Sequence, residues 1–422
     1  MENIIVIGGG LMGTSVTWKL AEQGEEVLLL EQQGAIYTNG SSYGAARISR
    51  SLGPKKDIFS FVHNQTVKEV ANLVQFLNKN GAVERHAMED IYTTSPVNYL
   101  YTKDQYADID KLRFKKQRKD YRKASGKAAL KKFGVTLKKE EVLVREYRQH
   151  SGTINPYALL QKLRLGIDKK GGRIRFNTKV TRLIKKDGVF ELSMLNTSTN
   201  KTTILKAQKV VVAAGPYTVS VLKDFAPYFN KIITPKRVLL GYFKITDERY
   251  QQLSATEIKK IFAAHPMFAQ IGKEYFSMVE RLEANGSPII KAGGHQIRRT
   301  IIDLDKVWTL PPRKKELKWI KKTFRQYLER LGIFLKKREI ELVDAYNCVY
   351  SETPTKIPLV GTIKDKFGIL DRDIIVIGGM SGTGAKGCLG YGVIGANLIT
   401  GKAGESTKIY KKAVRKFGSL VQ

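Results

Sequence analysis

The stretch NIIVIGGGLMGTSVTWKLAEQGEEVLLLEQ, residues 3–32, decides the fold of this chain. Its first apolar run, IIVI, is short and ends at glycines, which is typical of a buried strand in a parallel sheet. The segment TSVTWKLAEQG has the apolar spacing of a helix and ends at Gly24, a favourable residue for closing a helix. EVLLLE then predicts a second strand. Together these segments indicate one βαβ unit at the start of an α/β domain.

A glycine motif lies between the first predicted strand and the helix. Residues 8–13, GGGLMG, have the spacing G-x-G-x-x-G in the context that a dinucleotide site requires. Gly8 permits the tight turn, Gly10 lets the backbone approach a pyrophosphate, and Gly13 lets helix and strand pack closely. The helix N-terminus offers free N–H groups to the phosphates. Glu31 ends the second strand, where a carboxylate binds a ribose diol. The motif predicts a dinucleotide cofactor and leaves NAD and FAD open.

Length and cysteine content limit the class of protein. A chain of 422 residues is longer than a single core usually supports, so we expect two domains. Its two cysteines provide no disulfide framework, which is typical of a reducing compartment, and we expect a cytoplasmic protein. The N-terminal apolar run has no basic segment before it and predicts a strand, not a signal peptide. No apolar segment reaches the ~18 residues that span a bilayer, so we expect no membrane span.

The net charge of +34 is the least ordinary feature of the composition. Lysine and arginine concentrate in residues 111–139 and again in residues 312–339. Such an excess attracts nucleic acid, anionic membranes and acidic small molecules. The favoured interpretation is a set of solvated, lysine-rich helix faces. Steering of an anionic substrate and binding of nucleic acid stay open as alternatives.

The pattern along the chain alternates between two characters and predicts a discontinuous domain. We expect a Rossmann-like FAD- or NAD-binding α/β domain built from residues 1–81, 151–225 and 341–422. An antiparallel-sheet substrate domain, inserted into it, is expected at residues 82–150 and 226–340, where the sequence is β-rich, aromatic or basic. Residues 37–53 are rich in glycine and small polar residues and predict a long ordered loop.

Several motifs occur in a fixed order along the chain. They are the first 53 residues with TNGSSYGAARISR, then KVVVAAGPYT, PKRVLLGYF, IIKAGGHQ, NCVYSETP and IGGMSGTGAKGCLGYGVIGANLITGK. With them the chain resembles the D-amino acid oxidase superfamily of FAD enzymes, and within it monomeric sarcosine oxidase and N-methyltryptophan oxidase. The resemblance covers most of the chain and is weakest over residues 95–150. It implies a monomer that oxidises a secondary amine or an N-methyl or cyclic amino acid to an imine while O2 becomes H2O2.

The resemblance gives Cys348 a chemical role. In this family a cysteine followed two residues later by tyrosine carries the flavin through a thioether, and NCVYSET matches with Cys348 and Tyr350. The implied cofactor is therefore FAD, attached covalently through Cys348. The other cysteine, Cys388, lies at the apolar start of a predicted helix, and we interpret it as a packing residue.

Further site residues follow from the same resemblance. Arg50 and Lys386 are expected to hold the substrate carboxylate, since two cations from separate segments can clamp one carboxylate. Lys291 is expected over the flavin, where it activates oxygen. The remaining catalytic candidates are His295, Tyr275 and Tyr350. The remaining cofactor-binding candidates are Leu11, Met12, Ser41, Arg47, Val180, Gly215, Gly382 and Gly384, and no metal ligands are predicted.

Other functions stay open at this stage. The same superfamily includes a flavoenzyme that acts on a modified tRNA base, and residues 111–139 would then track phosphates. No signature of a common RNA-binding module is present in the sequence, and aromatics are not clearly interleaved with the basic residues. A D-amino acid oxidase, a glycine oxidase and a dehydrogenase are further alternatives. A flavin protein without turnover is disfavoured by Arg50, Lys291 and Lys386.

Overall fold

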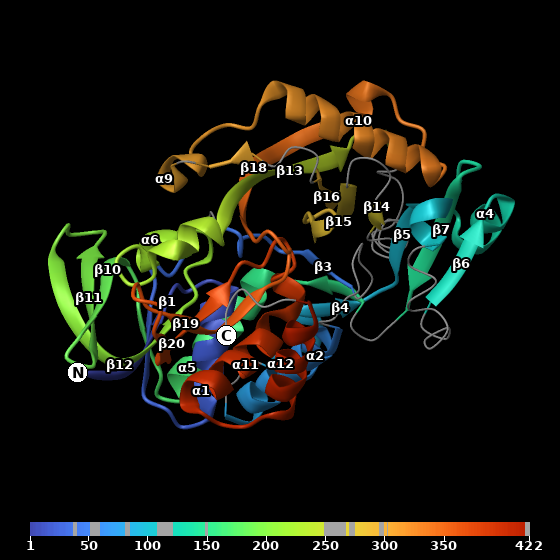
Figure 1. Ribbon diagram of the computed structural model, residues 1–422. Coiled ribbons are helices and arrows are strands. Elements are labelled where there is room, and N and C mark those ends of the chain that lie inside the picture. The colour runs from blue at the N-terminus through green and yellow to red at the C-terminus, as the bar shows by residue number, and fades with distance from the viewer. Residues whose placement is uncertain are drawn as a thin grey trace.

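A computed structural model describes residues 1–36, 40–50, 60–80, 85–107, 121–147, 151–248, 267–269, 275–294, 299–301 and 303–417. Two large sheets and one small sheet organise this part of the chain (Figure 1). The α/β class predicted from the sequence is confirmed. In Figure 1 the helical layer of the first sheet lies below, and the second sheet lies above and to the right.

The first sheet has a parallel core in the order β9-β2-β1-β12-β20. Ile5 of β1 lies opposite both Leu28 and Val210, so β1 has a parallel neighbour on each side. Ile4 packs into one hydrophobic cluster and Ile5 into another, because successive side chains point to opposite faces. A strand covered on both faces needs the continuous apolar run that the sequence shows. The eight described strands are β1 (Glu2–Ile7), β2 (Val27–Leu30), β9 (Arg173–Arg175), β10 (Thr178–Lys186), β11 (Val189–Asn196), β12 (Thr202–Val212), β19 (Leu359–Lys364) and β20 (Leu370–Gly378).

The helices that contain Val16, Ile394 and Tyr410 cover one face of this sheet. The β10–β11 hairpin and the short helix that contains Leu222 pack against the other face. Figure 1 shows most of the helices on one side of the sheet.

Asn155 caps one of these helices by accepting a hydrogen bond from the Ala158 amide (3.1 Å), and Pro156 occupies the first helical position. The helices of this region are α1 (Leu11–Glu22), α2 (Ser60–Asn80), α5 (Pro156–Lys169), α6 (Thr218–Leu222), α11 (Cys388–Thr400) and α12 (Glu405–Phe417).

The second sheet is antiparallel except where β14 runs parallel to β5. Its order is β17-β13-β16-β15-β14-β5-β7-β6, and β18 pairs along the length of β13. Helix α10 covers one face, where Phe324 stacks on Phe243 at 4.9 Å between ring centroids. The elements are β5 (Val97–Thr102), β6 (Tyr121–Ser125), α4 (Lys127–Phe133), β7 (Glu141–Glu146), β13 (Thr234–Ile245), β14 (Met267–Ala269), β15 (Tyr275–Leu282), β16 (Pro288–Gly294), β17 (Arg299–Thr300), α9 (Leu304–Val307), α10 (Lys314–Arg330) and β18 (Ile340–Glu352).

A small sheet connects the two large ones and corrects one expectation. Strand β3 (Arg47–Ser49) lies within residues 37–53, which were expected to form a loop. It pairs with β8 (Gly152–Ile154), which also pairs with β4 (Tyr92–Thr94). Three residues are too few for a hydrophobic alternation to show in the sequence, so pairing with β8 defines this strand. Short 3-10 turns complete the described elements: η1 (Met88–Asp90), η3 (Gly215–Tyr217), η4 (Pro227–Lys231), η5 (Lys337–Glu339) and η6 (Ala385–Gly387).

The division into two domains stays a prediction. One of its predicted boundaries does not coincide with the point where the chain passes from the second sheet to the first. Residues from 341 onward were assigned to the nucleotide domain. Strand β18 instead pairs with β13 over its whole length, with Val238 opposite Cys348, so it belongs to the second sheet. The chain returns to the first sheet at Leu359, the start of β19.

Candidate active site

The glycine motif forms a tight turn between β1 and α1. Gly8 has φ +102, a conformation that side chains other than glycine rarely adopt. A Cβ on Gly13 would lie 1.8 Å from the Gly8 carbonyl oxygen, so only glycine fits where the helix meets the turn. At the start of α1, the Leu11 amide donates to Ser42 Oγ (3.0 Å). The turn therefore has the shape that lets a backbone approach a pyrophosphate.

Glu31 closes the edge of this turn from the end of β2. Its carboxylate accepts hydrogen bonds from the Gly9 amide (2.6 Å) and the Gln33 amide (2.8 Å). Burial raises the pKa of Glu31, and the backbone donors of Gln33 and Gly9 oppose this rise. The carboxylate is thus fixed beside the glycine turn, where the sequence predicts the ribose contact.

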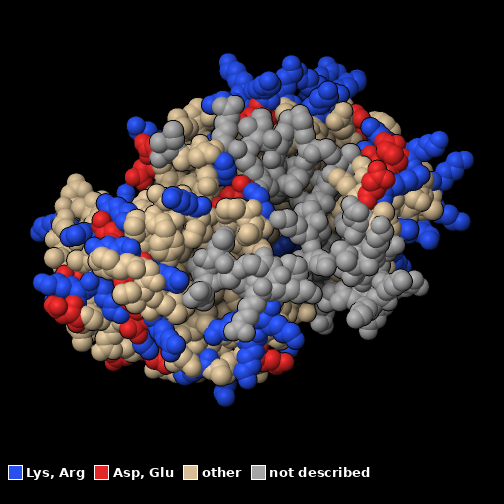
Figure 2. All heavy atoms as spheres, in the orientation of Figure 1, with Lys and Arg blue, Asp and Glu red and all other residues tan. Residues whose placement is uncertain are grey.

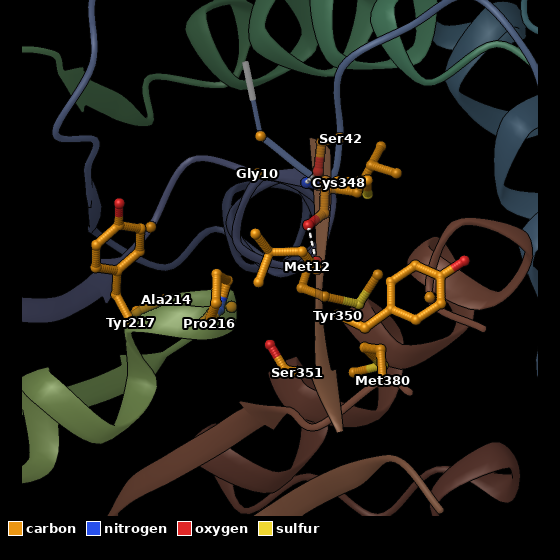
Figure 3. A pocket seen from close by; sticks show the side chains of 18 of the residues that line it. Gly10, Met12, Ser42, Ala214, Pro216, Tyr217, Cys348, Tyr350, Ser351 and Met380 are labelled. Atoms are coloured by element: carbon orange, nitrogen blue, oxygen red, sulfur yellow. Dashed lines mark hydrogen bonds between the residues drawn. The ribbon is translucent and has the colours of Figure 1, made fainter. Parts of the chain in front are cut away.

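One pocket joins the glycine turn to the second sheet (Figure 3). In Figure 3, Met12 and Ser42 lie near Cys348, with Tyr350 and Met380 on one side and Tyr217 and Pro216 on the other. The lining includes these predicted site residues: Gly8, Gly10, Leu11, Met12, Glu31, Ser41, Arg47, Val180, Gly215, Lys291, Cys348, Tyr350, Gly382 and Gly384. Residues from distant segments of the chain thus meet at one cavity.

Cys348 lies on β18 and faces the pocket with its side chain buried. Next to it, Ser41 donates a hydrogen bond to the Val349 carbonyl oxygen. Burial raises the pKa of the Cys348 thiol, and Arg47, Ser41 and Lys291 act in the opposite direction. Cys388 is buried in the cluster beneath α1 and α11, as expected of a packing residue, and burial raises its pKa to about 12.

Lys291 lies on β16 and is completely buried, although it lines the pocket. Its ammonium forms an ion pair with the Glu280 carboxylate and donates to the Ala46 carbonyl oxygen. Burial and the nearby charge of Arg47 lower the pKa of Lys291 to about 7, although the Glu280 carboxylate opposes both effects. The pocket therefore contains a cation that can lose its proton near neutral pH.

Arg47 provides a second cation at the same wall of the pocket. Its guanidinium donates to the Ala46 carbonyl oxygen (2.9 Å), to the Tyr346 hydroxyl (3.2 Å) and to the Tyr43 carbonyl oxygen. These contacts fix the segment that leads into β3. Because guanidinium groups keep their charge, Arg47 remains cationic at any working pH.

Four of the predicted site residues that the structure describes lie outside the pocket lining: Gly13, Arg50, Lys386 and Tyr275. Gly13 packs behind the glycine turn. The Arg50 guanidinium lies over the ring of Tyr99, 5.9 Å from its centroid, and Lys386 is buried in η6. The structure places β3, which precedes Arg50, in contact with η6, so the segments of the two expected carboxylate ligands are neighbours. The carboxylate clamp itself stays a prediction.

Tyr275 points away from the pocket. It packs in the cluster under α10, where its ring lies 5.9 Å from that of Tyr327. Phe276, the next residue, lines the pocket instead. The strand register explains this placement: Phe276 lies opposite Gly293, and Lys291 lies on the same face as Gly293. His295, the last predicted catalytic residue, lies outside the described residues.

The opposite end of the pocket contains residues that sequence reasoning missed. Trp308 Nε1 donates to the Tyr217 hydroxyl (3.1 Å), and Lys179 forms an ion pair with Asp305 (3.1 Å). Tyr217, Trp308 and Lys179 line the pocket, so the segment that contains α9 closes this end. Tyr217 lies within the motif KVVVAAGPYT, but no motif marks Lys179 or Trp308 in the sequence. Phe276 was missed as well, because its face depends on the register of β15 against β16.

The residues present fit FAD. The glycine turn leaves room for a pyrophosphate, and Glu31 provides a carboxylate for a ribose. At the far side of the pocket lie the half-buried cation Arg47, the buried cation Lys291 and the thiol of Cys348. In the part of the chain that the structure describes, no group of three or more His, Cys, Asp or Glu side chains could hold a metal ion. No described helix is long and apolar enough to cross a membrane.

Comparisons with known proteins agree with this reading of the fold and site. The family of FAD-dependent oxidoreductases named DAO matches residues 3–398. A probable sarcosine oxidase of Arabidopsis thaliana is 26% identical over 410 residues, which are 94% of this chain and 87% of that protein. The human peroxisomal sarcosine oxidase is 24% identical over 220 residues, which are 52% of each chain.

Solved structures show the same fold at low sequence identity. NikD in its open form, an unusual amino acid oxidase essential for nikkomycin biosynthesis, superposes with a TM-score of 0.70 at 17% identity over 96% of this chain and 95% of that chain. L-Proline dehydrogenase from P. horikoshii superposes with a TM-score of 0.70 at 16% identity over 99% of both chains.

Fold, glycine turn and family match together define a flavoprotein oxidoreductase. The chain belongs to the DAO family of FAD-dependent oxidoreductases, and its cofactor is FAD.

Proposed function

We propose that this protein is an amine oxidase that converts a secondary amine, or an N-methyl or cyclic amino acid, to an imine while O2 is reduced to H2O2. The observation that supports the proposal best is the meeting of Lys291 and Cys348 in the pocket of the glycine turn. The similarity to two sarcosine oxidases points to the same class of substrate.

The first part of the pocket would bind the nucleotide. Gly8, Gly10 and Glu31 would hold the pyrophosphate and a ribose, and the Tyr217–Trp308 pair would cover the other end. FAD, when bound, supplies the chemistry by accepting two electrons from the amine and passing them to oxygen. The chain itself supplies binding, orientation and charge.

The second part of the pocket would bind the substrate and oxygen. Lys291, when protonated, would place a fixed positive charge where O2 gains negative charge. The aromatic rings of Phe276 and Tyr350 would shape the wall beside the amine. The carboxylate of the substrate would be held by Arg50 and Lys386, which come from neighbouring segments. The amine loses two electrons and two protons, which O2 takes up to form H2O2, and water then hydrolyses the imine.

Cys348 would attach the cofactor covalently through a thioether, which replaces the thiol S–H and one C–H bond of the flavin methyl group. The two protons would be released, and the two electrons would pass to the flavin itself and then to O2. Its thiol lies buried in the pocket wall beside Arg47 and Lys291, whose positive charges favour the thiolate. The thiolate is the nucleophilic form of cysteine. A tether at this position would fix the flavin between the two sheets. Monomeric state and cytoplasmic location belong to the same proposal.

A panel of N-methyl and cyclic amino acids, assayed for peroxide release by the purified holoenzyme, tests the proposed reaction. We expect turnover with at least one secondary amine that has a carboxylate. Reduction of the flavin by a substrate without peroxide formation under air would identify a dehydrogenase instead. Absence of flavin reduction by the whole panel would contradict the proposed substrate class.

The basic surface gives the RNA alternative its only support. Figure 2 shows lysine and arginine gathered over α10 at the top of the molecule and around α4 at the right. Lys315, Lys318 and Lys322 of α10 are exposed, whereas Glu316 is buried. Their position on the outer face of α10 agrees with the favoured interpretation of solvated helix faces. Co-purification of RNA that ribonuclease removes, with loss of activity, would instead favour the tRNA enzyme.

A further inference from the structure

Glu280 is a buried carboxylate with a full set of partners behind the pocket wall. It lies on β15, is 6% exposed and forms the ion pair with Lys291 described above. Its two oxygens also accept hydrogen bonds from the Ala45 amide (2.5 Å) and the Ala46 amide (3.1 Å). One side chain thus connects the strand pair that contains Lys291 with the segment that contains Arg47.

The backbone around Glu280 explains how its side chain comes to face inward. The register of the β15–β16 pair shifts between Val279 and Arg281, so Glu280 is the extra residue of a β-bulge. Bulges of this kind redirect a side chain and are common next to active sites. Met278 lies opposite Lys291, and Glu280, two residues further along β15, lies on the same face by strand alternation and pairs with Lys291 there.

Gly44 shows how tightly the three charged groups gather. A Cβ at this position would lie 2.9 Å from Arg47 Nη1, 2.9 Å from Glu280 Oε1 and 3.6 Å from Lys291 Nζ. Gly44 also has φ +107, so a larger residue would be strained as well as crowded. Two cations and one anion therefore meet at one point of the wall with a net positive charge.

The charges decide what the carboxylate does. Two cations side by side in the pocket wall repel each other, and the more easily deprotonated one, Lys291, would lose its proton. Burial alone would raise the pKa of Glu280. The Lys291 ammonium and the Arg47 guanidinium outweigh this effect and hold the pKa of Glu280 below its usual range. Glu280 thus stays ionised and opposes the loss of the lysine proton.

We propose that Glu280 is a positioning residue that keeps Lys291 protonated at the pocket wall and ties the Arg47 segment to it. This inference rests on the proposed function of Lys291 toward oxygen. Glu280 itself does not line the pocket. Its effect would reach the reaction only through the charge and place of Lys291, and it would extend the pH range over which the lysine is cationic.

Among the described residues, four strands contribute a charged or titratable side chain next to Lys291. Glu280 comes from β15 and Arg47 from β3. The Tyr242 ring of β13 lies 5.9 Å from Lys291 Nζ, and Cys348 of β18 also acts on it electrostatically. Of these groups, Glu280 is the only one expected to be ionised and negative near neutral pH, because burial raises the pKa values of Cys348 and Tyr242.

The test compares Glu280→Gln, which removes the charge at nearly constant shape, with Glu280→Asp, which keeps it. Glu283→Gln is the matched control, because Glu283 lies just beyond β15 and pairs with Lys244 nearer the surface. Each holoenzyme is reduced chemically without substrate, and reoxidation by O2 is followed by stopped flow from pH 5 to pH 10. The visible spectrum of the oxidised flavin is titrated over the same range.

We expect Glu280→Gln to lower the lysine-dependent pKa in both measurements by about one to three units. This is the usual effect of a nearby opposite charge on the pKa of its neighbour. At pH 8 reoxidation would slow by up to about tenfold for each unit of the shift, and at low pH the difference would shrink. Glu280→Asp would restore part of the shift, and Glu283→Gln would match wild type.

An unshifted pKa in Glu280→Gln, whether or not its thermal stability falls, would overturn the proposal. The spectral titration does not depend on oxygen or on an amine substrate. If wild type fails to react with oxygen, the proposed oxidase function fails, and the spectral shift still decides the role of Glu280.

If Glu280→Gln does not fold, the spectral pKa of Glu280→Asp decides the matter. We expect that pKa to lie below the wild-type value, because the shorter carboxylate is farther from Lys291. A pKa equal to wild type in that variant would contradict the proposal.

Discussion

Ser41 donates a hydrogen bond to the carbonyl oxygen of Val349, a residue 308 positions further along the chain. This contact joins the segment after β2 to β18, directly beside Cys348. It brings a loop segment of the pocket wall against a strand of the second sheet. The thiol is therefore held at the junction where a nucleotide from the glycine turn would reach the second sheet.

Cys348→Ser is expected to remove the covalent tether and to retain FAD binding. When wild type is denatured in acid and separated by size, the yellow colour should stay with the chain, and in the variant it should separate. Cys388→Ser is the control, because Cys388 is buried in another cluster and does not line the pocket. Free flavin released from wild type would contradict the tether.

Formation of the tether is expected to accelerate with pH. Burial raises the pKa of the Cys348 thiol above its usual value, so the neutral thiol predominates at pH 7. Below that pKa the thiolate fraction rises roughly tenfold per pH unit. Apoprotein mixed with FAD at pH 7, 8 and 9 should therefore gain acid-stable flavin fastest at pH 9. Ser41→Ala should slow the reaction at each pH, because Ser41 acts to lower this pKa; equal rates at all pH values would count against thiolate attack.

Lys291→Met is expected to slow reoxidation by oxygen by about a hundredfold, the usual loss when one preorganised electrostatic group is removed. Anaerobic reduction by substrate should change much less. In wild type the reoxidation rate should fall as pH rises through about 7, because the ammonium loses its proton there. Stopped flow measures both half-reactions. Lys244→Met, on a neighbouring strand, is the control, and equal losses in both half-reactions would show that Lys291 has a structural role.

Gly13→Ala is expected to weaken FAD binding. The added methyl group would meet the Gly8 carbonyl oxygen, and overpacking of this kind costs about 1–3 kcal/mol, or roughly ten- to hundredfold in affinity. Fluorescence titration of the apoprotein with FAD measures the change. Gly34→Ala is the control, because a Cβ there would have its nearest neighbour at 3.7 Å. Unchanged affinity in Gly13→Ala would mean that the turn does not hold the cofactor.

Arg50→Ala is expected to raise the inhibition constant of a simple carboxylate by roughly ten- to hundredfold, the equivalent of a lost charge-assisted hydrogen bond. Neutralising Lys131 and Lys132, which are exposed on α4, should alter turnover little. Inhibition by acetate, measured at two salt concentrations, separates the local contact from long-range steering. The reverse order of effects, with a steep dependence on salt, would favour an RNA substrate.

The sequence alone determined the fold class, the glycine turn and the carboxylate at the end of β2, because these depend on local spacing and backbone conformation. It also marked Cys348 and Lys291, because their motifs are short and contiguous. Only the tertiary structure placed Phe276 instead of Tyr275 at the pocket, since a single step of strand register changes the face. Only the structure revealed Glu280, because its partner Lys291 lies on another strand and its partner Ala46 lies 234 residues away along the chain. Contacts between distant segments are set by packing, which no local pattern in the sequence records.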